Sequence, residues 1–484
     1  MENHSSDNYR HILKYTSLFG GVQGLNILIG IVRNKLVALI LGPAGMGLVS
    51  LYNSTITLLS TLTGFGMSMS GVKRTSEAFD FGGNSVRLRE TIRLIRSMSF
   101  VAAVFGVVVT AVLSGLLSQL TFGDYSHTWG FVALSPMVGM MAIITGELAV
   151  MKGVRMLRQL AKVSVFNVVA ALIVSVPLFY FYGWSGIIPS FLLLTFIQFV
   201  FTLRCSCSRF PWRISLRRKF LSKGNAILRL GMAFVLAGVF GTGADYLIRL
   251  FLNGAGNLDA VGLYNAGYMI TMVYGGLVFS AMETDYFPRL SAVAAKDVAQ
   301  QNDVVNKQVE VSLMVISPML CVFITFLPII LPLMFSNEFL PVLPMVQVAA
   351  IAMFLRALRL PMSYIALARA ESRSYLFLEG MYAVIVVPLV CLAFRLFGII
   401  GTGYALLLIA VVDYVMLSIY TYCKFGYAMS KSVLWQSLAM LPLVVMAYVS
   451  SQLLHGVAYW AAGCMVSAVC LVVSLCFLRN KTKR

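Results

Sequence analysis

The chain has 484 residues, of which 59% are hydrophobic and 11% charged, and its formal net charge is +19. Soluble domains carry about 25% charged residues, so this composition argues against a water-soluble enzyme. The length and the eight scattered cysteines argue against a small disulfide scaffold. The apolar residues come in runs of about 20, the length that crosses the roughly 30 Å hydrocarbon core of a bilayer. We therefore expect a polytopic membrane protein.

Fourteen hydrophobic segments follow one another along the chain. We expect each to be a membrane-spanning helix, because the backbone groups of a span must hydrogen-bond within it. The predicted fold class is thus all-α, with 14 transmembrane helices. The segments are 15–40, 45–71, 97–119, 129–151, 163–182, 185–204, 229–252, 260–284, 311–335, 341–366, 375–395, 398–422, 433–453 and 457–478.

The basic residues lie in alternate loops. Most of the 37 Lys and Arg residues follow the even-numbered segments or flank the two ends of the chain, and Arg96 is assigned here to the loop after the second segment. The positive-inside rule places these loops and both termini in the cytoplasm. This placement accounts for the net charge through the membrane surface, so we expect no nucleic-acid partner. The intervening loops 120–128, 183–184, 253–259, 336–340 and 454–456 contain no Lys or Arg.

Two parts of the sequence read alike at an offset near 212 residues. Residues 42–53 (GPAGMGLVSLYN) parallel residues 254–265 (GAGNLDAVGLYN), and Gly186 parallels Gly398, each followed by two isoleucines. A duplication of six helices predicts two pseudo-symmetric lobes that run the same way and enclose a central site. The predicted divisions are an N-lobe over 1–204, a basic cytoplasmic linker over 205–228, a C-lobe over 229–424, and two C-terminal helices with a basic tail over 425–484.

Several cations lie inside the apolar segments, where a charge is costly and usually faces a cavity or a partner. Guanidinium groups bind phosphate through paired hydrogen bonds. A cavity with more cations than acids would therefore suit an anionic headgroup. The candidate ligands for that headgroup are Arg33 and Lys35 in the first segment, Arg249 in the seventh, and Arg356 and Arg359 in the tenth.

Three intramembrane acids are candidates for a coupling or ion-pair role. Asp245 precedes Arg249 by four residues, so the two share a helix face and could form either a locking ion pair or a switchable one. Asp413, isolated in the twelfth segment, could bind a proton or cation, or bond to a neighbouring helix. Glu147, near the end of the fourth segment, could be neutralised by Lys152 or Arg155.

No catalytic constellation, Walker A sequence or metal-ligand spacing is present. We therefore predict a transporter rather than an enzyme. We expect no cofactor, with H⁺ or Na⁺ as the candidate coupling ion.

The stretch GIVRNKLVALILGPAGMGLVSLYN (30–53) resembles the first-helix signature of Wzx-type O-antigen and polysaccharide flippases, as does DYLIRLFLNGAGNLDAVGLYN (245–265). NKQVEVSLMVISPML (306–320) is similar to the ninth span of those proteins. They belong to the MOP superfamily, with the MATE exporters and MurJ-type flippases. The resemblance implies two six-helix lobes around a central cavity, two extra C-terminal spans, and a first-helix cavity arginine that Arg33 would match.

The resemblance also implies a function in the bacterial inner membrane. The chain would move undecaprenyl-pyrophosphate-linked oligosaccharide, an O-antigen or capsule repeat unit, from the cytoplasmic to the outer leaflet by alternating access. Its expected partners are this lipid-linked oligosaccharide and anionic membrane lipids, with polysaccharide polymerases and glycosyltransferases as further candidates. The alternatives are a MATE-like cation-coupled multidrug exporter, which predicts an acid-dominated cavity, and a non-transporting scaffold for glycan synthesis.

Overall fold

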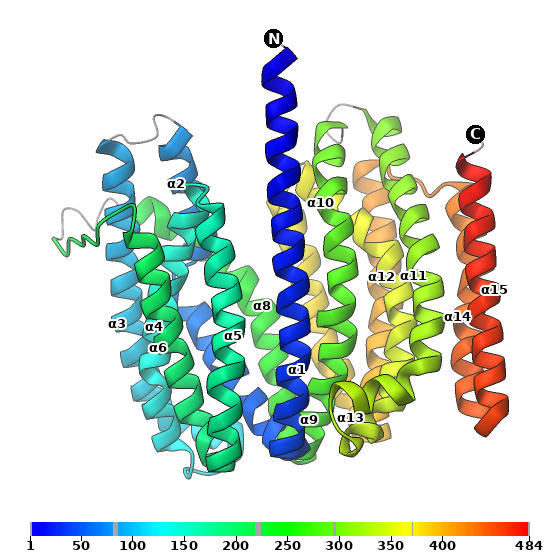
Figure 1. Ribbon diagram of the computed structural model, residues 1–484, viewed down its shortest axis with the longest axis horizontal. Helices are drawn as coiled ribbons and strands as arrows, with labels where there is room; N and C mark the ends of the chain where they lie inside the picture. The colour runs from blue at the N-terminus through cyan, green and yellow to red at the C-terminus, as the bar shows by residue number, and fades with distance from the viewer. Residues whose placement is uncertain (1, 81–85, 218–223, 294–296, 370, 483–484) are drawn as a thin grey trace. The chain divides into compact units, whose positions relative to one another are not determined.

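The computed structural model describes residues 2–80, 86–217, 224–293, 297–369 and 371–482, and every regular element in these ranges is a helix (Figure 1). The all-α prediction is therefore confirmed. The helices are α1 (Glu2–Thr63), α2 (Met67–Asp80), α3 (Val86–Phe122), α4 (Thr128–Gly153), α5 (Leu157–Tyr182), η1 (Gly183–Gly186), α6 (Ile187–Cys207), α8 (Asn225–Ala255), α9 (Leu258–Tyr268), η3 (Met269–Tyr274), α10 (Gly275–Val293), α11 (Val298–Met334), η4 (Asn337–Val342), α12 (Leu343–Ala368), α13 (Ser372–Phe425), α14 (Lys431–Leu453) and α15 (Gly456–Thr482).

Ten helical stretches among the described residues are long and apolar enough to cross a membrane. Three of them, Gly21–Thr63, Leu157–Cys207 and Phe377–Phe425, are 43, 51 and 49 residues long. About 20 residues already cross the hydrocarbon core, and each long stretch is interrupted, at Gly42, at Gly183 and at Gly398. The chain is thus a polytopic membrane protein, and the count of fourteen spans remains a prediction.

The interruptions depend on glycine. Gly42 and Gly398 both have φ of 65°, a conformation that residues with a Cβ atom rarely adopt. Gly183, between α5 and α6, has φ of 54°. The φ and ψ angles of Gly183 are closer to those of Gly398 than the φ and ψ angles of Gly186 are. The sequence comparison that paired Gly186 with Gly398 was therefore wrong by three residues in this hairpin. The match is Gly183 with Gly398.

The next glycine of each hairpin supports this correction. A Cβ atom on Gly186 would collide with the carbonyl oxygen of Leu178, eight residues earlier, and one on Gly401 would collide with that of Ala393, also eight residues earlier. The two helix–turn–helix elements thus share one local design: a left-handed glycine, then a second glycine that allows close backbone approach.

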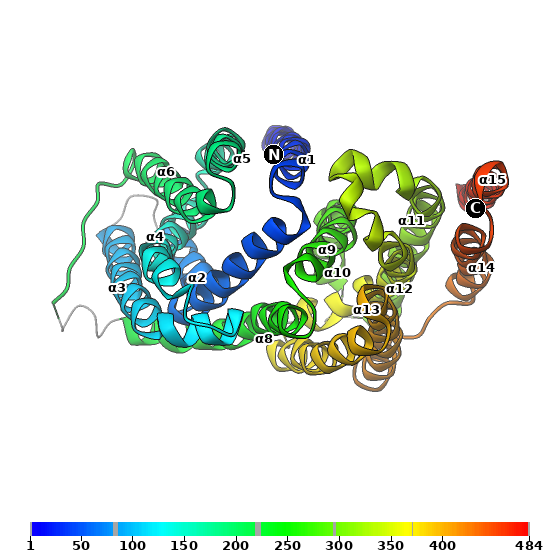
Figure 2. The same ribbon diagram turned by 90° about the horizontal axis from the view of Figure 1, so that it is seen from below.

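The chain divides into two compact units, Met1–Val261 and Gly262–Arg484. Within unit 1, α4 packs between α3 and α6, and Figure 2 shows these three helices side by side. α5 packs against α1 and α6, and α8 packs against α1, α2 and α3. The unit division rests on spatial contact, whereas the predicted lobes rest on sequence duplication. The predicted lobe boundaries therefore remain a prediction.

Unit 2 is organised around α11 and α12. α11 packs against α12, α14 and α15, and α12 packs against α13. The core between these helices is apolar and includes Leu313, Ile324, Phe354 and Met440, all fully buried. A π-helical stretch, η3, joins α9 to α10. The same arrangement leaves one side of α12 facing a cavity, which is where the predicted polar residues of this unit gather.

Candidate functional site

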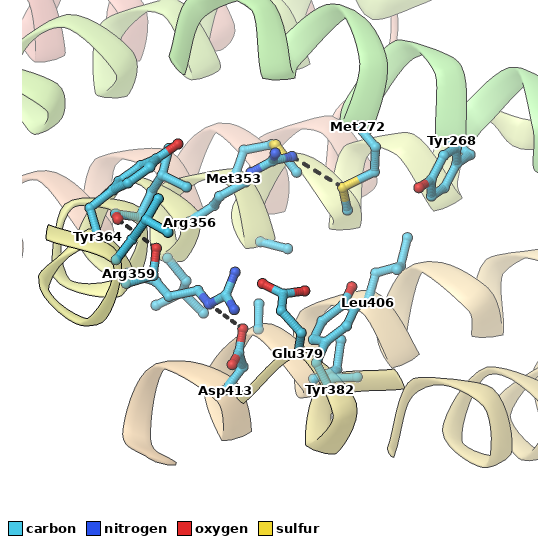
Figure 3. A pocket seen from close by; sticks show the side chains of 17 residues that line it. Tyr268, Met272, Met353, Arg356, Arg359, Tyr364, Glu379, Tyr382, Leu406 and Asp413 are labelled. Atoms are coloured by element: carbon cyan, nitrogen blue, oxygen red, sulfur yellow. Dashed lines mark hydrogen bonds and ion pairs between the residues drawn. The ribbon is translucent and has the colours of Figure 1, made fainter. Parts of the chain in front are cut away.

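A cavity of about 500 Å³ lies within unit 2. Its walls come from α12, α13 and the end of α9 with η3, and Figure 3 shows its labelled side chains. About half of the lining is apolar. The charged groups of the lining are Arg356, Arg359, Glu379 and Asp413. Three of these four were predicted from the sequence, and the structure brings them together from two different helices.

The sequence of α12 places its two arginines toward this cavity. Arg356 and Arg359 are three residues apart and therefore share a face of the helix. The neighbouring Phe354 and Ala357 are fully buried in the core of unit 2, on the opposite side. The helix continues through Pro361, whose carbonyl oxygen accepts a hydrogen bond of 2.7 Å from the Tyr286 hydroxyl.

Arg359 forms an ion pair with Asp413 of α13, through its Nε atom and the Oδ2 atom of the carboxylate. The Asp413 side chain is only 6% exposed, against 18% for Arg359. The second carboxylate oxygen, Oδ1, is buried and has no hydrogen-bond donor among the described residues. A buried carboxylate oxygen without a donor is unfavourable, so this atom is a position where a proton or a cation would be stabilised.

The remaining polar groups lie around this pair. Arg356 directs Nη1 to the Met272 sulfur at 3.5 Å, and its guanidinium lies 5.3 Å from the centre of the Phe279 ring. Figure 3 shows the Glu379 carboxylate pointing into the space between Arg359 and Tyr382. Two arginines and two carboxylates line the cavity. Taken alone, it is balanced in formal charge, unlike the cation-rich cavity expected from the sequence.

Tyrosine hydroxyls add neutral hydrogen-bonding groups to the same space. Tyr268, Tyr364 and Tyr382 line the cavity, and the Tyr382 ring lies 5.9 Å from the Arg359 guanidinium carbon. Each hydroxyl can both donate and accept. The cavity thus combines forked cationic donors for an oxyanion with neutral groups suited to hydroxyl-rich ligands.

In unit 1 the predicted Asp245–Arg249 ion pair is present. Arg249 is 5% exposed and also donates from Nε to the Ser50 hydroxyl of α1 at 2.6 Å and from Nη1 to the Asp245 carbonyl oxygen at 3.0 Å. These contacts tie α8 to α1. Both predicted roles of this ion pair, locking and switchable, remain predictions.

Arg33 and Lys35 lie on α1 before the break at Gly42. Arg33 donates from Nε to the Ser175 hydroxyl of α5 at 2.9 Å, and both side chains are half-buried. Ser50, the partner of Arg249, lies on α1 after the break. The first-segment cations and Arg249 thus contact different partners, and their assignment to a headgroup site remains a prediction.

Glu147 of α4 is paired with Arg96 of α3, not with Lys152 or Arg155 as expected. The two groups form two parallel hydrogen bonds of 2.8 and 2.9 Å, and both side chains are 1% exposed. The Ser206 hydroxyl also donates to Glu147. The assignment of Arg96 to a cytoplasmic loop was therefore wrong, because α3 begins at Val86 and carries Arg96 into the buried interior of unit 1.

Sequence reasoning left Glu379 and the three tyrosines out of the site, and it missed Arg96 as the partner of Glu147. Glu379 was not selected, because it lies only about one turn inside its predicted segment, where solvation is the simpler explanation. The Arg96–Glu147 pair was missed because its partners are 51 residues apart. The one available signal was the apolar Ile92, which lies four residues before Arg96 and therefore on the same face of a helix. The described residues contain no group of three or more His, Cys, Asp or Glu side chains that could hold a metal ion.

Comparison with known proteins identifies the family. Residues 12–294, more than half of the chain, match the family model described as polysaccharide biosynthesis protein. The chain therefore belongs to this family, as its resemblance to the polysaccharide flippases indicated. No curated protein sequence matches the chain.

Solved structures show the same fold. The chain is similar to the inward closed conformation of the lipid II flippase MurJ, with a TM-score of 0.76 and 12% identity over 96% of this chain and 100% of that one. It is also similar to the inward-facing conformation of a multidrug resistance MATE transporter of the MOP superfamily, with a TM-score of 0.67 and 14% identity over 82% of this chain and 95% of that one. A MOP superfamily transporter from Pyrococcus furiosus gives a TM-score of 0.52 at 13% identity, covering 83% of this chain and 93% of that one.

Proposed function

We propose that this member of the polysaccharide biosynthesis family is a flippase for an undecaprenyl-pyrophosphate-linked oligosaccharide, an O-antigen or capsule repeat unit. It would carry the headgroup from the cytoplasmic to the outer leaflet of the bacterial inner membrane by alternating access, with both termini in the cytoplasm. Polymerases and glycosyltransferases that act on the same lipid-linked oligosaccharide are the proposed protein partners. The family match and the fold shared with the lipid II flippase MurJ support this class of substrate.

The observation that carries the proposal is the pair of arginines in the cavity of unit 2. Arg356 and Arg359 reach one space of about 500 Å³, a size typical of small-molecule sites. Arginine forks match the paired oxygens of a phosphate group. In the proposed complex the two guanidinium groups bind the pyrophosphate, the tyrosine hydroxyls bind the first sugar, and the polyprenyl tail stays in the bilayer.

Asp413 would couple headgroup binding to a proton or Na⁺. The pyrophosphate and the Asp413 carboxylate would compete for the Arg359 guanidinium, because both are anions that need its donors. A proton or cation on Asp413 would remove this competition and favour headgroup binding. By linkage, the bound headgroup would raise the affinity of Asp413 for the cation by the same factor.

The membrane potential would favour outward movement of the headgroup. Moving one negative charge out of a negative interior gains about 2.3 kcal/mol per 100 mV. A pyrophosphate could therefore be driven outward without ATP.

Transport by arginine variants tests the proposal. The variants Arg356→Ala and Arg359→Ala would be expressed at matched levels in a strain that lacks its own repeat-unit flippase, and surface polysaccharide would be measured. Loss of one charge-assisted contact predicts at least about tenfold less transport. Arg395→Ala is the control, because Arg395 is exposed and lies outside the cavity. Unchanged surface polysaccharide in both cavity variants would contradict the proposal.

A cation-coupled drug exporter is the second candidate. Glu379 and Asp413 place two carboxylates in the cavity, and a carboxylate pair suits a cationic substrate; the MATE transporters share the fold. This function predicts that expression raises resistance to cationic dyes and that Glu379→Gln abolishes the resistance. A flippase for an anionic headgroup predicts no dye resistance in the parent chain.

A further inference from the structure

A second cavity, of about 390 Å³, lies in unit 1 where α3 begins and where the chain leaves α6. It is separate from the cavity of unit 2, and no part of the proposed transport step uses it. One wall is the first three turns of α3 and the other is the non-helical segment 209–213. Six charged side chains line it, namely Arg89, Glu90, Arg93, Arg96, Arg209 and Arg213. We call this space the arginine cavity.

The segment 209–213 is held in place by buried contacts. Phe210 is 6% exposed and packs in the apolar core cluster that includes Ile92 and Ile95 of α3. Arg96 donates from Nη1 to the Pro211 carbonyl oxygen at 2.6 Å. The amide of Ser215, two residues after the end of this segment, donates to the Ser97 hydroxyl at 2.9 Å. Both walls of the arginine cavity are therefore fixed by α3.

The charges of the arginine cavity are not balanced. The charge of Arg96 is neutralised by Glu147, which does not line the cavity. Glu90 is then the single carboxylate in the lining beside four arginines. Within the part of the chain that the structure describes, Arg89, Arg209 and Arg213 take part in no ion pair. Four forked cationic groups around one cavity favour an anion with several oxygen acceptors.

The residues around the arginine cavity are of the kinds typical of a membrane interface. The Trp212 ring lies 5.1 Å from the Arg96 guanidinium and remains 36% exposed. Tryptophan is enriched at the level of lipid headgroups, and basic residues beside a span attract anionic lipids. Arg89 and Arg93 on α3, and Arg209 and Arg213 after α6, lie in the stretches that the positive-inside rule assigns to the cytoplasmic side.

We propose that the arginine cavity is a binding site for the phosphate of an anionic lipid headgroup in the cytoplasmic leaflet. The guanidinium groups of Arg89, Arg93, Arg209 and Arg213 hold the phosphate oxygens, and Trp212 lies at the headgroup level beside them. A soluble phosphate ion offers the same oxygens. The test therefore compares the two sources of phosphate directly.

The test measures binding to the purified full-length chain in a neutral detergent. The probes are dihexanoyl phosphatidylglycerol, dihexanoyl phosphatidylcholine and inorganic phosphate, each titrated calorimetrically. The variant carries Arg89→Gln, Arg209→Gln and Arg213→Gln, three exposed side chains whose replacement leaves the buried Arg96–Glu147 pair intact. Thermal unfolding of each protein confirms that it is folded.

A matched control removes the same charge from elsewhere in unit 1. It carries Lys152→Gln, Arg158→Gln and Lys162→Gln, which are exposed, lie outside the arginine cavity and belong to another of the predicted cytoplasmic loops. We expect the control to bind phosphatidylglycerol like the parent chain. We expect the arginine variant to bind it at least about tenfold more weakly, as loss of a charge-assisted contact predicts.

Three results would overturn the proposal. The first is equal affinity for phosphatidylglycerol in the parent chain and the arginine variant. The second is equally weakened binding of phosphatidylglycerol in the arginine variant and the control, which would show that overall positive charge, and not the arginine cavity, attracts the lipid. The third is binding of phosphatidylcholine or of inorganic phosphate as tightly as phosphatidylglycerol, which would remove the anionic lipid as the specific ligand.

Discussion

Arg359 of α12 and Asp413 of α13 are ion-paired at the wall of the unit 2 cavity, with Asp413 the more deeply buried of the two. The carboxylate contacts the guanidinium at Nε, so its negative charge opposes the binding of an anionic ligand to the same guanidinium.

Replacing Asp413 by asparagine should tighten binding of an anionic headgroup. The amide keeps the shape of the side chain and removes the competing charge, so Arg359 becomes available. We expect about fivefold higher affinity for a short-chain polyprenyl diphosphate, which corresponds to about 1 kcal/mol. Equilibrium binding to purified protein measures this, with Arg359→Ala as the control that abolishes the gain. Weaker binding by Asp413→Asn would show that the carboxylate positions Arg359 rather than competing for it.

Breaking the Arg96–Glu147 pair should destabilise unit 1 strongly. Removing one partner leaves the other charge buried without compensation, which costs about 3–5 kcal/mol. We therefore expect Arg96→Met and Glu147→Gln each to lower the free energy of unfolding by that amount. The double variant should lose less than the sum of the two, because it leaves no isolated charge. Thermal or denaturant unfolding in detergent provides the measurement, and additive losses would mean that the two charges act independently.

Acidification should weaken the contact between α1 and the turn before α4. The Tyr52 hydroxyl lies 2.7 Å from His127 Nδ1, and the Phe122 ring stacks on the imidazole. Burial lowers the pKa of His127 below its usual 6.5, although the nearby Asp124 opposes the shift. The unfolded chain then binds the proton more readily, so stability is lost as the pH falls below about 6.5.

A histidine variant isolates this effect. His127→Gln should flatten the dependence of Tm on pH between about pH 8 and pH 5, the range in which histidine changes charge. The parent chain should unfold at a lower temperature at the acidic end. An identical pH profile in the variant would assign the loss of stability to other groups.

Alanine at Gly398 should destabilise unit 2 through the backbone alone. A Cβ atom there meets no neighbour within 4 Å, but φ of 65° with ψ of −146° is a conformation that alanine avoids. Such strain costs about 1–3 kcal/mol. Gly30→Ala is the matched control, because Gly30 is helical and equally open, so alanine there should stabilise by about 0.5–1 kcal/mol. Equal unfolding temperatures for both variants would argue against a special role for the break.

The parts of the fold that follow local rules were predictable from the sequence. Apolar runs with few charges predicted the helices, and residues 30–53, 245–265 and 306–320 carried a family resemblance that the family match confirmed. The spacing of Asp245 and Arg249 fixed their ion pair, because a helix brings residues four apart onto one face.

The pairs between helices were not predictable in the same way. Which helix faces Glu147, or which side of α12 faces α13, depends on packing among elements far apart in the chain. Arg96 therefore looked like a loop cation, and Asp413 looked isolated until Arg359 was found beside it. The repeat was placed three residues out of register at Gly398, because apolar hairpins offer several matches and the left-handed backbone is what singles out Gly183.

The π-helical stretch Met269–Tyr274 lies in the wall of the unit 2 cavity, and its winding differs from that of the α-helices before and after it. It supplies Met272, the thioether that contacts Arg356, and a π turn holds one more residue than an α turn. Conversion of this stretch to regular α-helix would turn the chain on one side by about 100°, the angular interval of one residue. The contact between Met272 and Arg356 therefore depends on the extra residue that the π turn accommodates.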